Sequence, residues 1–436
     1  MPFDFSSHYA HPGNMPFSQR RATMPWRQQA PLSASERHSA WQDLLAHPLP
    51  NNPRLLYLHI PFCATHCTFC GFYQNPLNDD TLEKYCQALL QELEMEAHSP
   101  LHQSAPIQAI YLGGGTPSAL SASQLSMIIH AIRRALPLAR DCEITVEGRI
   151  LDFDDRRLEA CLEAGVNRFS LGIQTFDTRL RQRLGRRTGR QAMIDFICHL
   201  AERSQATLVG DLMFGLPGQT LESWQDDLAV IRQLPLDGID LYALNLFPST
   251  PLAKGVAAGR QQLPTPEWCR NAYTLACDTL AADNWRQLSN SHWARTRKER
   301  NRYNLLIKSG ADYLALGCSA GGSLDGAAFM NLRSLPDYFD KVLCGEKPLA
   351  MMTRRSADYH WRMAIQGGLD TGYCDLSAIL PDPTQLMPLL TQWQTCGLLS
   401  CQSEGTFTLT TEGRFWASNM LDALQQIIPV IRQASA

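Results

Sequence analysis

The sequence predicts an α/β fold: a partial (β/α)6 barrel over residues 51–345, with an extended N-terminal arm over residues 1–50 and a small C-terminal winged-helix-like domain over residues 346–436. Two observations predict the barrel. Short apolar runs alternate with amphipathic stretches six times, and polar motifs follow the apolar runs. Strands that alternate with helices form a parallel sheet with right-handed crossovers, and functional side chains gather at the C-terminal ends of its strands.

Each barrel element is predicted from its own pattern. The apolar runs expected to form buried strands are 55–59, 109–112, 143–147, 168–173, 207–214 and 238–244. The amphipathic stretches expected to form helices are 81–97, 121–136, 155–164, 190–203, 220–233 and 268–282.

The two flanks lack this alternation. Residues 1–50 are rich in Pro, Ser, Gln and Arg and show no sustained period, which predicts an arm that crosses another surface. After about residue 350, the segments 358–365, 383–396 and 407–410 predict a small helical domain that ends in a hairpin and is similar to a winged helix.

The composition is that of a globular protein. Apolar residues make up 44% and charged residues 19% of the chain, and the formal net charge of -3 gives no reason to expect nucleic acid as a partner. We find no secretion signal and no apolar run of about 18 residues, so we expect no membrane association and a cytoplasmic location. The fourteen scattered cysteines then favour reduced thiols, most of them small core residues.

One group of cysteines is tightly spaced. Cys63, Cys67 and Cys70 form a C-x3-C-x2-C array in the loop after the first expected strand. Three thiolates on one loop hold three corners of a cubane iron–sulfur cluster and leave the fourth iron open. The alternative interpretation is a zinc site closed by His66 or His59.

This array and the preceding Tyr57-Leu-His-Ile-Pro-Phe resemble the radical S-adenosylmethionine (SAM) signature, in its coproporphyrinogen dehydrogenase (HemN-like) branch. The resemblance covers about residues 54–340. It implies that Cys63, Cys67 and Cys70 are catalytic and hold a [4Fe–4S] cluster, whose open iron binds SAM and cleaves it reductively to a 5′-deoxyadenosyl radical. It also implies that Phe69 lines the adenine and that Tyr57 reaches the sulfonium side.

Further SAM contacts follow from the same resemblance. A Gly-Gly-Gly-Thr-Pro motif follows the second strand, where glycines let the backbone approach a ligand closely. The resemblance assigns to SAM Gly114, Gly115 and Thr116 of this motif and Glu147 at the end of the third strand. After this glutamate the family usually has Asp or Asn and then Pro, whereas this chain has Gly148 and Arg149.

Four polar or small residues at later strand ends resemble contacts to a second SAM molecule. They are Gln174, Arg186, Asp211 and Ala243, which lie near the ends of the fourth, fifth and sixth strands. Taken singly, Gln174 and Asp211 are equally well explained as core polar groups that have hydrogen-bond partners. Because all four match in register, the resemblance implies two SAM molecules.

Two groups of basic residues are candidates for binding carboxylates. They are Arg179, Arg181, Arg183, Arg186, Arg187 and Arg190, and then Arg295, Arg297, Lys298, Arg300 and Arg302. Most are expected to be solvated surface residues. Porphyrins carry propionates, which guanidinium groups bind in a forked geometry, so one or two of these arginines are expected to bind a porphyrin substrate.

Three groups of proteins within the HemN-like branch are candidate matches for this sequence: dehydrogenases, heme chaperones and heme-utilisation methyltransferases. Dehydrogenases carry another cysteine two places after the cluster motif, where this chain has Phe72, and heme chaperones lack that cysteine too. The continuation Gly-Phe-Tyr-Gln-Asn75 and the long N-terminal arm resemble the heme-utilisation group of radical SAM methyltransferases (HutW and ChuW). This resemblance implies anaerobic heme breakdown by methyl transfer, ring opening and iron release, with heme as substrate and a low-potential electron donor such as flavodoxin.

The resemblance leaves the ligand of the heme iron open. The candidates are His8, His11, His59, His66, His292 and His360, each of which is also explained as an ordinary polar residue. Cys318 is a second candidate for substrate contact, and a core thiol is its alternative role.

Overall fold

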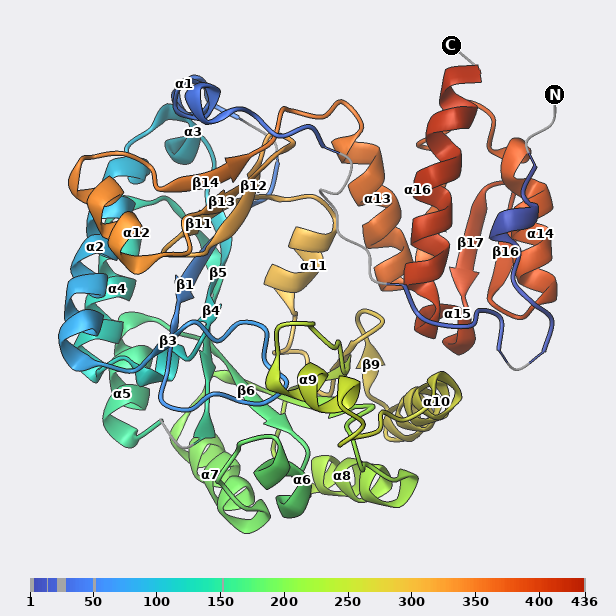
Figure 1. The fold of residues 1–436 in the computed structure, drawn as a ribbon, viewed down its shortest axis with the longest axis horizontal. Helices are drawn as coiled ribbons and strands as arrows, with labels where there is room; N and C mark the ends of the chain where they lie inside the picture. The colour runs from blue at the N-terminus through green and yellow to red at the C-terminus, as the bar shows by residue number, and fades with distance from the viewer. Residues whose placement is uncertain (1–3, 14, 22–28, 50–51, 151–152, 435–436) are drawn as a thin grey trace.

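The computed structural model describes residues 4–13, 15–21, 29–49, 52–150 and 153–434. A twelve-stranded sheet, covered on its outer face by helices, forms the larger part of the molecule. A smaller domain of helices and a three-stranded sheet lies beside it (Figure 1). Within the described residues, no helix combines the length and the apolar character needed to span a bilayer.

The parallel part of the large sheet contains all the predicted barrel strands. These are β1 (Arg54–Ile60), β4 (Ile107–Gly114), β5 (Leu138–Gly148), β6 (Arg168–Gln174), β7 (Thr207–Phe214) and β8 (Gly238–Ala243). They are neighbours in sequence order and pair in parallel. The predicted partial (β/α)6 barrel is therefore confirmed.

The sheet extends beyond these strands on both sides. Strand β11 (Asp312–Leu316) pairs in parallel with β1, and β12 (Gly321–Leu324), β13 (Ala327–Asn331) and β14 (Leu349–Met352) follow it in antiparallel order. On the other side, β10 (His292–Ala294) and β9 (Arg286–Gln287) follow β8. Because β14 begins after residue 345, the sheet crosses the boundary that the sequence predicts for the barrel.

The predicted barrel helices are also present. They are α2 (Asp79–Ala97), α4 (Ala122–Ala135), α5 (Asp155–Ala164), α7 (Arg190–Arg203), α8 (Leu221–Gln233) and α10 (Pro266–Ala282). Side chains fix where several of them begin, because the Asn78 side chain accepts a hydrogen bond from Thr81 N and Ser121 forms a capping box with Gln124. Shorter helices are α3 (Pro100–Gln103), α6 (Thr178–Arg183), α9 (Pro251–Ala257), α11 (Arg302–Lys308) and α12 (Leu335–Leu343).

Alternation along the strands separates two faces. In β1, Leu56 and Leu58 pack in the main core, whereas Leu55 and Tyr57 lie in a second apolar cluster with Tyr303 of α11. Successive side chains of a strand point to opposite faces, so one set covers the helix layer and the other lines the barrel interior. The polar site described below lies on this interior face.

The N-terminal arm contains a helix, whereas the sequence predicts an extended arm. Residues 34–45 form α1 (Ala34–Leu45), which begins at a capping box between Ser33 and Glu36. Trp41 of this helix is fully buried, and its Nε1 donates to the Glu96 carboxylate at 3.1 Å. The helix is not amphipathic over its whole length, so periodicity missed it, whereas the Ser-x-x-Glu capping box was a readable signal.

The first residues of the arm pack on the C-terminal domain. The 3-10 helix η1 (Ser6–His8) precedes Ala10, whose backbone makes two hydrogen bonds to the Gln392 side chain. Further along, Leu32 N donates to Met352 O at 2.8 Å, so the arm also reaches the edge strand β14. The arm therefore contacts both parts of the molecule, and Figure 1 shows its first turn beside α14.

The C-terminal domain contains more than the sequence analysis expected. Its elements are α13 (Tyr359–Thr371), β15 (Tyr373–Asp375), η4 (Pro383–Leu386), α14 (Met387–Thr395), β16 (Leu399–Ser403), β17 (Thr406–Leu409), α15 (Thr411–Phe415) and α16 (Ala417–Ala434). The expectation that the domain ends in a hairpin is wrong, because α16 follows the β16–β17 hairpin. Met420, Leu424, Ile427 and Ile431 form its buried stripe at helical spacing, a period that the sequence analysis overlooked.

Candidate active site

The loop that carries the three clustered cysteines leaves β1 and is closed at its base. The short strands β2 (Phe62–Cys63) and β3 (Asn75–Pro76) pair in parallel, and Leu77 N donates to Cys63 O at 3.2 Å. Cys63 and Cys67 are buried, and Cys70 is half-buried. The fold therefore presents three thiols from one anchored loop, which we call the cluster loop (residues 63–74).

The surroundings of these thiols suit ligands of a positively charged centre. Thr116 Oγ1 donates to Cys63 Sγ at 3.3 Å, and Phe72 N donates to Cys70 Sγ at 3.3 Å. The pKa of Cys63 is raised to about 11, mainly by burial and to a smaller extent by negative charge on Cys70 and Cys67. Three neighbouring thiolates are stable together only where metal compensates their charge, so this donor set fits an iron–sulfur cluster.

The two histidines of the zinc interpretation make other contacts. The exposed ring of His66 stacks on Tyr73, with the ring centroids 4.1 Å apart. His59 Nδ1 lies 2.9 Å from Tyr57 Oη, on the buried side of the strand. Among the described residues, no group of three or more His, Cys, Asp or Glu side chains is arranged to hold a single metal ion.

The glycines after β4 bring its backbone against β1. Gly114 has a φ of 104°, and a Cβ atom there would lie 2.5 Å from the His59 ring. A Cβ atom on Gly115 would lie 2.6 Å from Ile60 O. Only glycine fits this close approach. The approach also sets Thr116 beside Cys63.

Gln174 is held in an uncommon conformation at the end of β6. Its φ is 64°, and the pairing with β7 shifts register between Gly172 and Gln174. The side chain is buried, and its Oε1 has no hydrogen-bond partner among the described residues. Non-glycine residues with positive φ are uncommon and cluster at functional sites.

Arg186 lies beside Gln174. Its Nη1 donates to Gly172 O at 2.7 Å, its guanidinium stands 6.0 Å from the centre of the Phe69 ring, and its Nε has no partner among the described residues. A buried polar group without a partner costs about 1–3 kcal/mol, so Gln174 and Arg186 are suited to a polar ligand.

Two half-buried carboxyl groups face the same space. Burial raises the pKa of Glu147 to about 7, although Arg186 opposes this rise. Burial raises the pKa of Asp211 well above its usual range, and negative charge on Asp240 and Glu147 adds to the effect. Ser170 Oγ donates to Asp211 Oδ1 at 3.1 Å. A cationic ligand such as SAM would stabilise the ionised forms of Glu147 and Asp211.

A buried ionic network lies next to these carboxyl groups. Arg168 donates to both oxygens of Glu299, at 3.0 and 3.2 Å. His292 lies between two acids, with Nδ1 2.9 Å from Asp240 and Nε2 3.1 Å from Glu299. The network accounts for His292 without a ligand, because both ring nitrogens face carboxylates.

The other residues assigned to SAM lie on neighbouring elements: the cluster loop, β8 and β1. Phe69 packs in an apolar cluster with Leu184, Met213 and Leu216. Ala243 ends β8 and is half-buried. Tyr57 stacks on Tyr111 of β4, with ring centroids 6.5 Å apart. Cys318 is buried, and its thiol donates to Arg333 O at 3.1 Å, as expected of a core thiol.

Arg149 is a site residue that the sequence analysis did not assign. Its Nη2 donates to Thr65 Oγ1 at 2.8 Å, and its Nη1 donates to Thr65 O at 3.2 Å. Thr65 lies between Cys63 and Cys67, so Arg149 fastens the cluster loop to the end of β5. The signal was the departure from the family pattern after Glu147.

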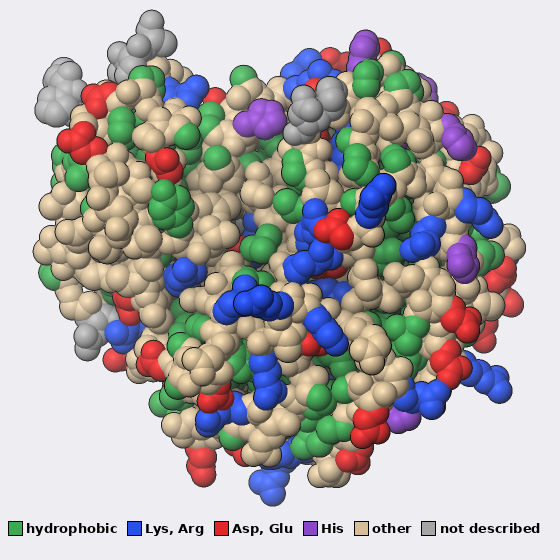
Figure 2. All heavy atoms as spheres, turned by 180° about the vertical axis from the view of Figure 1, so that it is seen from behind, with side chains coloured by type: hydrophobic (Ala, Val, Ile, Leu, Met, Phe, Trp, Pro, Cys, Tyr) green, Lys and Arg blue, Asp and Glu red, His purple; other side chains and the backbone are tan. Residues whose placement is uncertain are grey.

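Many of the predicted basic residues already have partners. Arg181 donates to the carbonyls of Ile173 and Thr188, and Arg190 pairs with Asp226. Arg300 and Arg302 pair with Asp141. Figure 2 shows basic side chains near the middle of the rear face with acidic side chains among them. The ion pairs of Arg190, Arg300 and Arg302 fit the surface role that was expected of most basic residues, whereas Arg181 is buried.

Comparison with known proteins agrees with this site. Residues 57–231 match the radical SAM superfamily. The chain belongs to this superfamily, whose enzymes use a [4Fe–4S] cluster and SAM. It is 49% identical over 429 residues to an anaerobilin synthase of Escherichia coli O157:H7, covering 98% of this chain and 96% of the relative.

Two further relatives bear on the fold. A heme chaperone HemW of Lactococcus lactis is 30% identical over 286 residues, covering 66% of this chain and 74% of the chaperone. The solved structure of coproporphyrinogen III oxidase (HemN) from Escherichia coli matches with a TM-score of 0.75 and 22% identity, covering 91% of this chain and 96% of that one. The HemN-like fold therefore extends over both domains.

Proposed function

We propose that the chain degrades heme without oxygen: it transfers a methyl group from SAM by a radical route, opens the porphyrin ring, and releases iron and a linear methylated tetrapyrrole. The observation that carries this proposal is the 49% identity to an anaerobilin synthase, which extends over 98% of this chain. The likeness therefore includes the N-terminal arm and the C-terminal domain, which lie outside the matched radical SAM segment.

In this proposal, Cys63, Cys67 and Cys70 hold the cluster. When bound, the cluster supplies the electron that cleaves SAM to methionine and a 5′-deoxyadenosyl radical. Arg149 keeps the cluster loop in place through Thr65. The residues proposed to hold the first SAM are Tyr57, Phe69, Gly114, Gly115, Thr116 and Glu147.

We assign a second SAM to Gln174, Arg186, Asp211 and Ala243. Support comes from Gln174 Oε1 and Arg186 Nε, which have no hydrogen-bond partner in the part of the chain that the structure describes and which a polar ligand would satisfy. Asp211 would lose its proton and face the positive charge of SAM. This second molecule would donate the methyl group.

Aromatic side chains beside the cluster loop suit a flat substrate. Phe72 is 58% exposed, and its ring lies 6.0 Å from that of Phe247 in an edge-to-face pair. An exposed phenylalanine that packs against a half-buried one favours contact with a planar, largely apolar macrocycle. Phe72 also occupies the position where dehydrogenases have a cysteine, which disfavours coproporphyrinogen oxidation.

A heme chaperone is the second candidate function. The chaperone of Lactococcus lactis matches over 66% of this chain, so a carrier role remains consistent with the barrel alone. A carrier binds heme but consumes no methyl donor. Turnover therefore separates the two functions.

The test is anaerobic turnover of the reconstituted protein with heme, SAM and a chemical reductant. We expect 5′-deoxyadenosine and a ring-opened tetrapyrrole, both detected by mass spectrometry, and neither with the Cys67→Ala variant. Recovery of intact heme beside abundant 5′-deoxyadenosine would favour the carrier. In a parallel reaction given coproporphyrinogen in place of heme, formation of protoporphyrinogen would favour the dehydrogenase. Within the described residues, none of the fourteen cysteines is in a disulfide, which suits the reducing cytoplasm as the place of reaction.

A further inference from the structure

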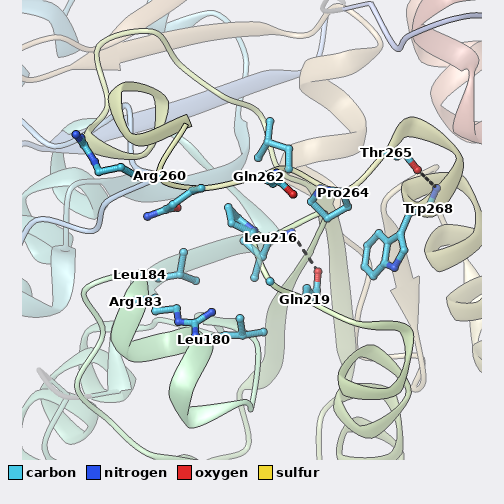
Figure 3. Close-up of a pocket in the computed structure, with 14 residues that line it drawn as sticks. Leu180, Arg183, Leu184, Leu216, Gln219, Arg260, Gln262, Pro264, Thr265 and Trp268 are labelled. Atoms are coloured by element: carbon cyan, nitrogen blue, oxygen red, sulfur yellow. Dashed lines mark hydrogen bonds between the residues drawn. The ribbon is translucent and has the colours of Figure 1, made fainter. Parts of the chain in front are cut away.

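A hollow of about 840 Å³ lies between α6, the loop after β7 and the segment that joins α9 to α10. Apolar side chains form much of its lining, including Leu184, Leu216 and Trp268. Arg183 and Arg260 also line it, and Figure 3 shows Arg183 below and Arg260 above the hollow. The hollow is thus apolar inside with two arginines at its margin.

The segments around the hollow are basic and contain no acids. Residues 178–190 hold six arginines and residues 251–266 hold Lys254 and Arg260, and neither segment contains Asp or Glu. The exposed members form a set that we call the basic rim: Arg179, Arg183, Arg187, Lys254 and Arg260. Within the described residues, no rim side chain has a carboxylate at ion-pair distance, unlike the nearby Arg190 and Arg203, which pair with Asp226 and Glu159.

The basic rim is joined directly to the cluster loop. Thr68 follows Cys67, and its backbone N–H donates to Leu184 O at 3.1 Å. Thr68 Oγ1 also donates to Arg183 O, at 3.4 Å. Leu184, which lines the hollow, is therefore hydrogen-bonded to the residue that follows the cluster cysteine Cys67.

A wall of side chains separates the hollow from the candidate SAM site. Leu184 and Leu216 line the hollow, are buried, and pack in one apolar cluster with Phe69. A molecule in the hollow would not touch Gln174 or Glu147. The hollow therefore suits a partner that must come close to the cluster without entering the reaction space.

We propose that the basic rim and the hollow form the docking surface of an acidic flavin-carrying protein that reduces the cluster. This inference rests on the proposed function, because SAM cleavage requires one electron from outside the chain. The electron leaves the anionic flavin hydroquinone, which becomes the neutral semiquinone, and it reduces the cluster from the 2+ to the 1+ state. The unpaired cations attract an acidic surface in a chain whose net charge is -3.

The experiment uses the full-length reconstituted protein and flavodoxin hydroquinone, mixed anaerobically in a stopped-flow instrument. For the R183E/R260E variant, we expect the second-order rate constant of cluster reduction to fall at least about tenfold at low ionic strength. In the R183Q/R260Q variant, this rate constant should fall less. The wild-type rate should decrease as salt is added, and the R183E/R260E rate should depend on salt much less.

The matched control is R297E/K298E. It makes the same change in charge on exposed residues after β10, which lie next to the start of β8 and so at the opposite end of the barrel strands. We expect its rate to stay within about twofold of wild type, and dithionite to reduce all variants equally. The docking proposal would be overturned if flavodoxin reduced the cluster of R183E/R260E as fast as that of wild type. It would also be overturned if both charge-reversed variants lost the same fraction of this rate.

Two further measurements distinguish a failure of the docking proposal from a failure of the proposed function. Calorimetric binding of oxidised flavodoxin should weaken in R183E/R260E and not in R297E/K298E, and this result does not depend on turnover of heme. Weaker heme binding by R183E/R260E with an unchanged reduction rate would show that the hollow takes carboxylates of a small ligand instead. Absence of SAM cleavage by wild type with dithionite would contradict the proposed function, while flavodoxin binding would still test the surface.

Discussion

At the scale of single residues, Glu147 couples SAM binding to pH. Burial raises the pKa of Glu147 to about 7 in the free site, and SAM carries positive charge that favours the ionised carboxylate. Ionisation must therefore accompany binding below pH 7. We expect SAM affinity to fall about tenfold from pH 8 to pH 6, measured by calorimetry on the reconstituted protein. In Glu147→Gln the affinity of the first SAM site should be weak and nearly independent of pH, and an unchanged slope for that site would contradict this role.

Asp211 affects both stability and methyl transfer. Its pKa is raised in the folded protein, so the folded state keeps a proton that the unfolded state releases. Stability is therefore lost as pH rises from the ordinary carboxyl range towards the folded pKa. We expect Asp211→Asn to melt at least as high as wild type, with a larger difference at pH 8 than at pH 6. A variant that melts lower and more so at high pH would contradict the raised pKa.

The same Asp211→Asn variant separates the two SAM sites. Because the amide side chain of asparagine cannot ionise, it cannot balance the charge of the proposed second SAM. We expect methylated product to fall at least about tenfold while formation of 5′-deoxyadenosine by the first SAM changes little. Equal loss of both products would place Asp211 at the first site or in the fold alone.

At the scale of elements, Arg149 ties the end of β5 to the cluster loop. Its guanidinium donates two hydrogen bonds to Thr65, and hydrogen bonds to charged groups contribute about 1.5–3 kcal/mol each. We expect Arg149→Met to lose iron faster than wild type during anaerobic gel filtration and to broaden the EPR signal of the reduced cluster. Arg149→Lys should retain more iron than Arg149→Met, because lysine keeps the positive charge. It should retain less than wild type, because lysine lacks the forked donors of the guanidinium group. Full retention of iron by Arg149→Met would show that β2 and β3 alone hold the cluster loop.

The barrel elements were predictable because each carries its own local pattern. The run at 168–173 alternates apolar residues with polar or small ones, the run at 207–214 is mostly apolar, and each is followed by an amphipathic stretch. Strand β11 was missed because Asp312–Leu316 is short and pairs with β1, far away in sequence. Helix α1 was missed because its stability comes from Trp41, which packs between elements that are distant in the chain.

The candidate site was predictable only in part for a similar reason. The spacing of Cys63, Cys67 and Cys70 is local, so the sequence reveals it directly. The positive φ of Gln174 arises from a register shift between β6 and β7, and the contact of Arg149 with Thr65 joins residues 84 positions apart. Such tertiary pairings leave no periodic signal in the sequence.

At the scale of the whole molecule, the arm and the C-terminal domain are joined to each other. Gln392 exchanges two hydrogen bonds with Ala10, Trp393 Nε1 donates to His8 O at 3.1 Å, and Asn419 Nδ2 donates to Gln19 O at 2.9 Å. His8 therefore lies on the C-terminal domain, whereas His66 lies on the cluster loop. Of the predicted iron ligands, His66 is the exposed one that the fold places beside the cysteines.

The measurement that tests the central claim most directly is turnover with SAM that carries a trideuterated methyl group. The protein, reconstituted anaerobically, would be given heme, this SAM and a reductant, and the tetrapyrroles would be analysed by mass spectrometry. We predict a ring-opened tetrapyrrole that carries deuterium from the methyl group, together with 5′-deoxyadenosine and free iron. Intact, unlabelled heme beside abundant 5′-deoxyadenosine, with every reductant tried, would contradict the claim that this chain is a heme-degrading methyltransferase.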